Sequence, residues 1–229
     1  MQKEETLSRL PFFCHLTEEQ KRRMLESSRI ASYQAGDLIY TPVRECLGMT
    51  IVLSGSIRTY LVSESGKKAT IFRLRSGEVC ILSMTCLLSA ITFDVEVEAA
   101  EDCSLLIIPA PVFASISQEN IYAENFSYKV VADRFSNLIE AVQQMMFMTL
   151  EQRVVAYLLD ESSLPDQSSI QQEPNTAVVL ITQEQLAENI GSAREAVSRV
   201  LKQLKGKGLV SVERGKIFLH SKKDLYGLL

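Results

Sequence analysis

The sequence predicts an α+β protein with two folded domains joined by a long helix, and three observations support this prediction. Short β-rich segments separated by glycines fill residues 30–109, a helical pattern without proline or glycine follows over residues 120–148, and two capped helices and a hairpin lie near the C-terminus. At 229 residues, with 46% hydrophobic and 23% charged side chains, the chain can fold two domains with separate cores. We expect these domains over residues 1–118 and 149–229, with the connecting helix over 119–148.

The N-terminal domain is expected to begin with helices and continue as a sandwich or barrel. Residues 1 to about 28 have a helical pattern, in which Thr17 and Gln20 form a capping box before an apolar face that includes Met24. Regularly spaced short strands separated by turn residues are typical of a sandwich or barrel. Six β-rich runs are predicted as strands: LIY, MTIVL, SIRTYLV, ATIFRL, VEVEA and SLLII.

The long helix carries a repeat that predicts pairing with a second helix. Apolar residues recur at alternating spacings of three and four, at Tyr128, Val131, Phe135, Leu138, Val142 and Met145. A helix of this length spans about 40 Å, which is too long for one small domain to cover, so we expect a homodimer. The alternative is that the helix packs on its own β-domain, for which Ile139 and Met146 offer a second stripe. A shorter helix is expected from Thr149 to about Ser162, before a polar linker.

The C-terminal region predicts a helix-turn-helix followed by a hairpin. Two capping-box patterns, Thr182 with Gln185 and Ser192 with Glu195, open helices on either side of Gly191. Each helix has an apolar face, so the two can pack at a steep angle across a short turn. The segment LVSVERGKIFLH that follows has the pattern of a hairpin, with Arg214, Gly215 and Lys216 at its tip.

Charge is distributed unevenly along the chain, and the C-terminal region is cationic. The net charge is −4, yet residues 192–223 carry nine Lys and Arg against two Glu. Arginine can bind guanine O6 and N7 through two hydrogen bonds, glutamate can accept from cytosine N4, and serine or lysine suits phosphate oxygens. The residues predicted to contact double-stranded DNA are Arg194, Glu195, Arg199, Ser192, Ser198, Lys202 and Lys216. The alternative is a winged helix that makes protein contacts only.

Other functional classes find little support in the sequence. There is no Ser/His/Asp arrangement, P-loop, HExxH or motif-placed carboxylate pair, so we expect no enzyme and no catalytic residue. No apolar run approaches the roughly 20 residues that span a bilayer, and no signal-peptide layout is seen, so we expect a cytoplasmic protein without membrane contact.

The cysteines and histidines predict no metal centre. The five cysteines are odd in number and scattered, without a CxxC pair, which argues against both a disulfide framework and a closed zinc site. His15 and His220 are isolated and are expected to be structural. Haem is left open, because its ligands need not be neighbours in the sequence.

The segment GSAREAVSRVLKQLKGKGLV resembles the recognition helix of the Crp/Fnr family of transcription regulators, and the likeness covers nearly the whole chain. By this resemblance Arg194, Glu195 and Arg199 fall on the three base-contacting positions of the catabolite-activator branch, which implies a palindromic site with TGTGA-like half-sites. The segments PFFCHLTEEQ, AGDLIY and VLSGSIRTYLVSESGKKATIFRLRSGE, with the long helix, resemble the family's jelly-roll-like β-roll and dimerisation helix. The resemblance also implies RNA polymerase as a partner, and an effector in the β-roll that reorients the DNA-binding domains.

The effector is not identified by the sequence. Gly77 and Glu78 match the Gly-Glu pair of cyclic-nucleotide members, but residues 79–99 contain no Arg or Lys to hold a phosphate, which argues against cyclic AMP. Cys14 alone near the N-terminus argues against an iron-sulfur cluster, which needs four ligands. The resemblance implies that the candidate effector-binding residues are Gly77, Glu78, Cys80, Ser83 and Cys86.

Cys80 and Cys86 could sense oxidation, nitric oxide or a metal. We favour the alternative that they are buried apolar residues, because no Lys, Arg or His lies nearby in sequence to lower a thiol pKa. The function predicted is a sequence-specific DNA-binding regulator under a small-molecule or redox signal. The competing hypothesis is a ligand-binding module that acts through protein contacts without binding DNA.

Overall fold

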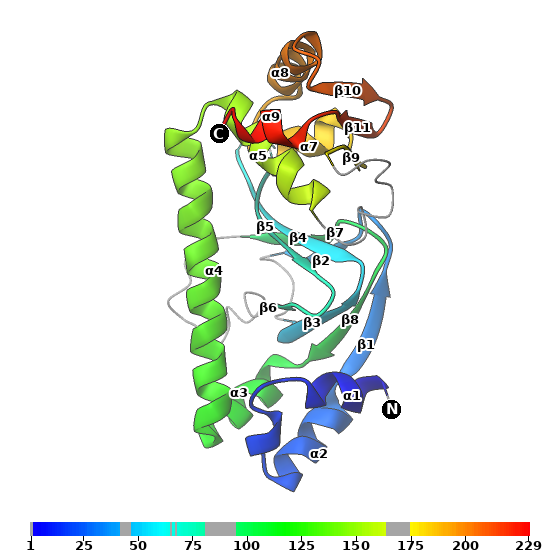
Figure 1. Ribbon diagram of the computed structural model, residues 1–229. Helices are drawn as coiled ribbons and strands as arrows, with labels where there is room; N and C mark the ends of the chain where they lie inside the picture. The colour runs from blue at the N-terminus through cyan, green and yellow to red at the C-terminus, as the bar shows by residue number, and fades with distance from the viewer. Residues whose placement is uncertain (1, 42–46, 65, 67, 81–94, 164–174) are drawn as a thin grey trace. The chain divides into compact units, whose positions relative to one another are not determined.

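The computed structural model describes residues 2–41, 47–64, 66, 68–80, 95–163 and 175–229 (Figure 1). The chain divides into two compact units. The N-terminal unit comprises Met1–Val62 and Ile71–Ile139, and the C-terminal unit comprises Ser63–Thr70 and Glu140–Leu229. Among the described helices, none is long and apolar enough to cross a membrane.

The N-terminal unit starts with helix α1 (Gln2–Ser8), a 3-10 turn (Phe13–His15) and helix α2 (Glu18–Ser27). The capping box predicted at the start of α2 is confirmed. The Thr17 hydroxyl accepts from the Gln20 amide at 3.2 Å, and the Gln20 side-chain oxygen accepts from the Thr17 amide at 3.0 Å. Two otherwise unpaired amide groups are thereby satisfied at the helix end.

Eight strands of this unit form two four-stranded sheets, ordered β1-β8-β3-β6 and β2-β7-β4-β5. Six of them fall on the six predicted runs, which confirms those predictions. The sequence pattern did not separate out the short β6, or β1, whose side chains are mostly exposed. The strands are β1 (Arg29–Tyr33), β2 (Leu38–Tyr40), β3 (Met49–Ser54), β4 (Ser56–Val62), β5 (Lys68–Arg75), β6 (Val79–Cys80), β7 (Glu96–Ala99) and β8 (Cys103–Ile108).

Two hydrophobic cores lie on opposite faces of the sheet that contains β8. Leu105 and Ile107 of β8 pack between the two sheets, whereas Leu106 and Ile108 pack against the helices. This division follows from the period-two alternation of side chains along a strand. The sandwich interior and the helical layer therefore both depend on one buried strand.

Two further helices follow the last strand of the sandwich. Pro109 precedes α3 (Ala110–Glu119), and Asn120 separates it from the long helix α4 (Ile121–Phe147). The helix over Ala110–Glu119 was not expected from the sequence, whereas the predicted long helix is confirmed. Asn120 caps the N-terminus of α4: its side-chain oxygen accepts from the Tyr122 and Ala123 amides at 3.0 and 3.3 Å.

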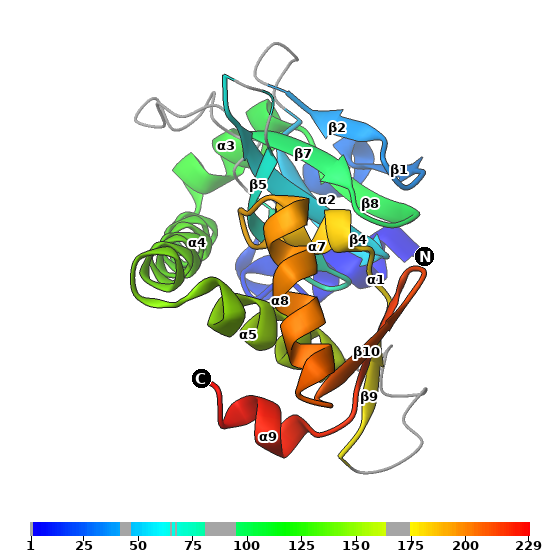
Figure 2. The ribbon, with the colours of Figure 1, turned by 90° about the horizontal axis from the view of Figure 1, so that it is seen from above.

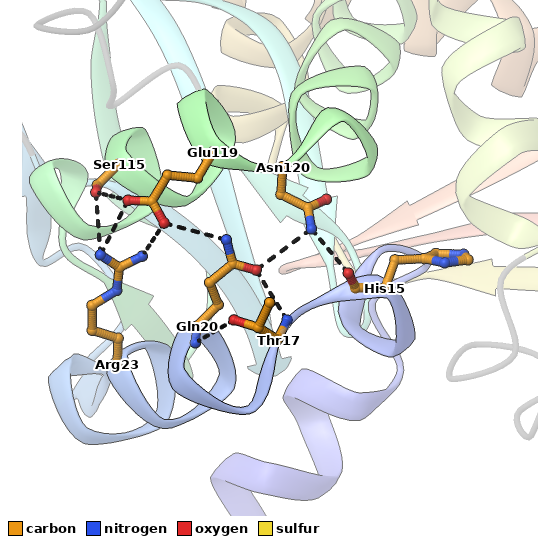
Figure 3. Close-up of polar contacts among 7 residues, drawn as sticks. All are labelled: His15, Thr17, Gln20, Arg23, Ser115, Glu119 and Asn120. Carbon is orange, nitrogen blue, oxygen red and sulfur yellow. Dashed lines mark hydrogen bonds and ion pairs between the residues drawn. The ribbon is translucent and has the colours of Figure 1, made fainter.

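A polar network joins α2 to the corner between α3 and α4 (Figure 3). The side-chain amide of Asn120 donates to the His15 carbonyl at 2.9 Å. Arg23 pairs with Glu119 at 2.7 Å, and the Gln20 side-chain amide donates to the same carboxylate at 3.3 Å. The start of α4 is thus fixed to the N-terminal helices by hydrogen bonds as well as by packing.

The C-terminal unit contains α5 (Leu150–Ser162), β9 (Ala177–Val179), α7 (Gln183–Asn189), α8 (Arg194–Gly206), β10 (Val210–Glu213), β11 (Lys216–Leu219) and α9 (Lys222–Tyr226). Its sheet has the order β10-β11-β9, and all three strands run antiparallel to their neighbours. Side chains of α5, α7, α8 and the sheet share one core. The short elements β9 and α9 were not predicted, and most of the polar linker lies outside the described residues.

Candidate DNA-binding interface

The turn between α7 and α8 is held by backbone geometry and by a side chain from α5. The predicted capping box of Thr182 and Gln185 opens α7, as expected. Gly191 has φ +63°, a left-handed conformation that glycine adopts at little cost, and the next amide, of Ser192, donates to the Ala187 carbonyl at 2.8 Å. Arg153 of α5 donates to the Ile190 carbonyl at 2.9 Å. The turn is therefore held by a backbone hydrogen bond to α7 and by a side chain of α5.

The apolar faces predicted for the two helices are both buried. Figure 2 shows α8 beside α7 in the C-terminal unit. The residues predicted to pack between and beneath them are less than 8% exposed, namely Leu186, Ala187, Ile190, Val197, Val200, Leu201 and Leu204. This burial confirms the packing expected of a helix-turn-helix.

The second predicted capping box is wrong by one residue. Helix α8 begins at Arg194, and its N-cap is Ala193, which has no side chain able to accept a hydrogen bond. Ser192 belongs to the turn instead, because its amide is bonded to the Ala187 carbonyl. The first amides of α8 consequently lack a side-chain acceptor from within the helix cap.

Six of the seven predicted DNA-contacting residues lie on α8 or in the turn before it. Arg194, Glu195, Arg199 and Lys202 are exposed, and Ser192 and Ser198 are half-buried. The Arg199 guanidinium donates to the Glu195 carbonyl at 3.4 Å, and Arg194 Nε lies 3.8 Å from a carboxylate oxygen of Glu184 on α7. Hydrogen-bond donors and acceptors are thus presented together along one exposed helix face, as a contact with base edges would require.

The seventh residue, Lys216, lies on the hairpin. The structure corrects its position slightly, because Lys216 is the first residue of β11 and pairs with Glu213 of β10. The turn itself is made by Arg214 and by Gly215, which has φ +73°. Lys216 and Arg214 are both exposed, so the hairpin carries a basic end.

The apolar seam of α4 is uncovered in the single chain. Tyr128, Phe135, Val142 and Met145 are 61%, 62%, 41% and 46% exposed, and Val131 and Leu138 are half-buried. Ile139 and Met146, the stripe on which the alternative relied, are exposed as well. Helix α4 packs on its own domain instead through Ala123 and Val130.

Of the candidate effector residues, the structure describes Gly77, Glu78 and Cys80, whereas Ser83 and Cys86 lie outside the described residues. The Gly77 amide donates to the Val52 carbonyl at 2.8 Å, and a Glu78 oxygen accepts from the Arg75 amide at 2.8 Å. Cys80 is buried and lines a small cavity between the two sheets, together with Ile39, Tyr40, Leu47, Thr50, Ile57 and Val97.

Sequence reasoning missed Arg134, which brings a cation to Glu78 from the long helix. Its guanidinium donates to the Val79 carbonyl at 3.1 Å, lies 3.5 Å from a Glu78 oxygen and stands 5.5 Å from the centre of the Phe72 ring. Arg134 lies far along the chain from residues 79–99, the segment in which a phosphate-binding cation was expected. A weak signal was present in the sequence: Arg134 follows the apolar Val130 by four residues, so both side chains lie on the same face of α4.

The described residues that line this cavity are uncharged. None of its lining residues is cationic, and a buried phosphodiester needs a charged partner. Among the described residues, none forms a hydrogen bond with the buried Thr50 hydroxyl.

Within the described ranges, no three His, Cys, Asp or Glu side chains cluster as a metal site. The described cysteines form no disulfide; Cys14 is exposed, and Cys80 and Cys103 are buried. Burial, followed by the neighbouring Asp102, raises the pKa of the Cys103 thiol. A raised pKa disfavours the thiolate, so Cys103 is a poor nucleophile.

Similarity to known proteins agrees with this architecture. Residues 152–228 match the model of the Crp-like helix-turn-helix domain, and residues 30–120 match the cyclic nucleotide-binding domain. The chain is 26% identical over 211 residues to the cAMP-activated global transcriptional regulator Vfr of Pseudomonas aeruginosa, covering 90% of each chain. The c-di-GMP-responsive regulator CLP of Xanthomonas campestris shares the fold, at 20% identity with a TM-score of 0.74, over 90% of this chain and 100% of CLP.

A solved transcriptional regulator of the Crp/Fnr family from Eubacterium rectale is more similar. The two sequences are 32% identical, and the two structures superpose with a TM-score of 0.87. The match covers 96% of this chain and 97% of the solved chain. The two matched domains, the relatives and the order of sandwich, long helix and helix-turn-helix all agree. The chain therefore belongs to the Crp/Fnr family of transcription regulators.

Proposed function

We propose that the protein binds double-stranded DNA as a homodimer, at a palindromic site with TGTGA-like half-sites. The observation that carries the proposal is the exposed set of Arg194, Glu195 and Arg199 on one face of α8. Each arginine can bind a guanine through two hydrogen bonds, and the glutamate can accept from cytosine N4. Ser192, Ser198, Lys202 and Lys216 would contact phosphates, which fix the register without reading the sequence.

The uncovered seam of α4 supports the homodimer. An exposed apolar repeat over this length is unfavourable in water and is buried when two copies of the helix pair. A two-fold symmetric dimer presents two copies of α8, which match the two half-sites of a palindrome. As an activator or repressor of transcription in the cytoplasm, the dimer would meet RNA polymerase at its sites.

The proposed signal enters through the N-terminal unit. Vfr and CLP are named for cyclic AMP and cyclic di-GMP, but the apolar cavity beside Cys80 favours a different input. We favour an uncharged small molecule, or oxidation at Cys80, over a phosphodiester, because no described residue that lines the cavity is cationic. Cys86, the second candidate thiol, lies outside the described residues. Gly77, Glu78 and Ser83 complete the set of candidate contacts.

Selection from random duplex DNA with the purified, reduced protein tests the proposal directly. We expect enrichment of a palindrome with TGTGA-like half-sites, with affinity that falls as salt rises because phosphate contacts release counterions. The Arg199→Ala variant should lose about 1–3 kcal/mol for each base pair that Arg199 contacts, and its preference for that base pair should relax.

Lys205→Ala is the matched control, because Lys205 is an exposed cation in the last turn of the same helix. It should keep the sequence preference of the wild type. If no palindrome is enriched with or without oxidant and small molecules, or if both variants behave alike, the proposal fails. The ligand-binding module that acts through protein contacts would then be the better explanation.

A further inference from the structure

Glu184 of α7 places a carboxylate beside the exposed face of α8, which carries Arg194, Arg199 and Lys202 together with Glu195. It lies in the first turn of α7, and its carboxylate is 3.8 Å from the Nε of Arg194. The two side chains are 67% and 62% exposed. Of the ion pairs that the structure describes, this is the one that engages a proposed base-contacting residue.

The pair has little effect on the stability of the fold. Exposed ion pairs contribute little to the free energy of unfolding, because water screens them and ordering two long side chains costs entropy. The packing of α7 on α8 depends on the buried residues between them, which are apolar. The consequence of Glu184 is therefore expected in binding rather than in folding.

The carboxylate acts differently on the two kinds of contact that DNA offers. A phosphate is repelled by Glu184 whatever the base sequence, since any bound duplex brings phosphates within a Debye length of about 8 Å. A correctly placed guanine instead gives Arg194 two acceptors, which replace the single carboxylate contact. Only at the correct half-site do hydrogen bonds from Arg194 to guanine offset the repulsion between Glu184 and the phosphates.

We propose that Glu184 is a specificity-determining residue, which weakens binding to the phosphate backbone more than binding to the correct half-site. In the free protein the carboxylate forms an ion pair with Arg194, and this ion pair breaks when Arg194 binds guanine. This inference rests on the proposed DNA-binding function. It assigns to α7 a part in sequence discrimination, in addition to its packing role beneath α8.

The test compares Glu184→Gln with the wild type on a duplex that carries the selected site and on one of scrambled sequence. We expect the affinity for the scrambled duplex to rise about fivefold and that for the site to rise no more than about twofold, so that the specificity ratio falls. The slope of log affinity against log salt should steepen by about one on the scrambled duplex, as for one additional phosphate contact.

Two further variants separate this effect from a change in charge or fold. Glu151→Gln makes the same charge change in the same unit and removes the ion pair of Glu151 with Lys207, so it should leave the ratio unchanged. Glu184→Asp keeps the charge and should keep a ratio close to that of the wild type.

An unchanged ratio in Glu184→Gln, or weaker binding to the selected site, overturns the inference while the proposed function stands. Weaker site binding would mean that Glu184 positions Arg194 for guanine rather than competing for it. A wild type without any sequence preference overturns the proposed function and this inference with it.

Discussion

At the scale of single residues, several side-chain contacts that stabilise the folded state join positions far apart in the sequence. Arg23 and Glu119 are an example, since the carboxylate also accepts from Ser115 at 2.8 Å and from Gln20. The hydrogen bond from Arg23, followed by those from Ser115 and Gln20, lowers the pKa of Glu119 to about 2. An ionised Glu119 is therefore part of the folded state.

The pH dependence of stability follows from this lowered pKa. Because the pKa of Glu119 is lower in the folded state than the ordinary value of 4.5, its contribution is present above about pH 4.5 and is lost as the pH falls toward 2. Glu119→Gln should lower the urea midpoint at pH 7, and the difference from the wild type should shrink between pH 4.5 and pH 3. Glu26→Gln, at an exposed position, should show no such trend. A constant difference at all pH values would contradict the prediction.

Two contacts between single residues at the proposed sites could not be predicted from the sequence. Neither the approach of Arg134 to Glu78 nor that of Glu184 to Arg194 leaves a periodic or motif signal, because each joins side chains of different elements. By contrast, Arg194, Glu195 and Arg199 were predicted from one helix, because their spacing of one and four residues places them on a common face.

At the scale of elements, short turns decide where helices begin. The motif of Ser192 and Glu195 predicted a capping box, yet the left-handed Gly191 draws Ser192 into the turn and moves the start of α8 to Arg194. A capping pattern reports local preference, and here the hydrogen bond to the Ala187 carbonyl outweighs it.

Replacement of Gly191 tests the importance of that turn. Gly191→Ala should lower the free energy of unfolding by about 1 kcal/mol or more, because a side chain is strained at positive φ and its Cβ would lie 3.1 Å from Met145 Cε. Urea denaturation followed by circular dichroism would measure the loss.

Gly206 provides the matched control in the last turn of α8. It has no positive φ, and an added Cβ would meet nothing within 4 Å, so Gly206→Ala should be neutral or stabilising by up to about 1 kcal/mol. Equal losses in the two variants would show that the conformation of Gly191 is not what matters.

At the scale of the whole molecule, the proposed homodimer depends on the exposed seam of the long helix α4. Phe135 is 62% exposed in the middle of the seam, so Phe135→Glu should leave the fold of the chain intact and place two carboxylates at the helix pairing. We expect a monomer by analytical ultracentrifugation, and a loss of affinity for the palindrome that is much smaller for a single half-site.

Phe147 is the control, because it is 78% exposed on the same helix but outside the predicted seam. Phe147→Glu should remain a dimer under the same conditions. A dimeric Phe135→Glu variant would contradict the proposed seam.

The sequence by itself determined the features that depend on neighbours along the chain. The capping boxes of α2 and α7, six strands, the length of α4 and the apolar faces of α7 and α8 all follow from local periodicity and hydrogen-bonding preference. These signals were sufficient for the fold class, because hydrophobic patterning largely decides which faces can be buried.

Only the tertiary structure decided the features that depend on distant partners. The order of strands in the two sheets, the short strand β9 beside β11, the cation that Arg134 brings to Glu78 and the carboxylate beside Arg194 each join segments with no shared local pattern. The physical reason is that burial and Coulomb interactions act through space, whereas sequence patterns report only what adjacent residues favour.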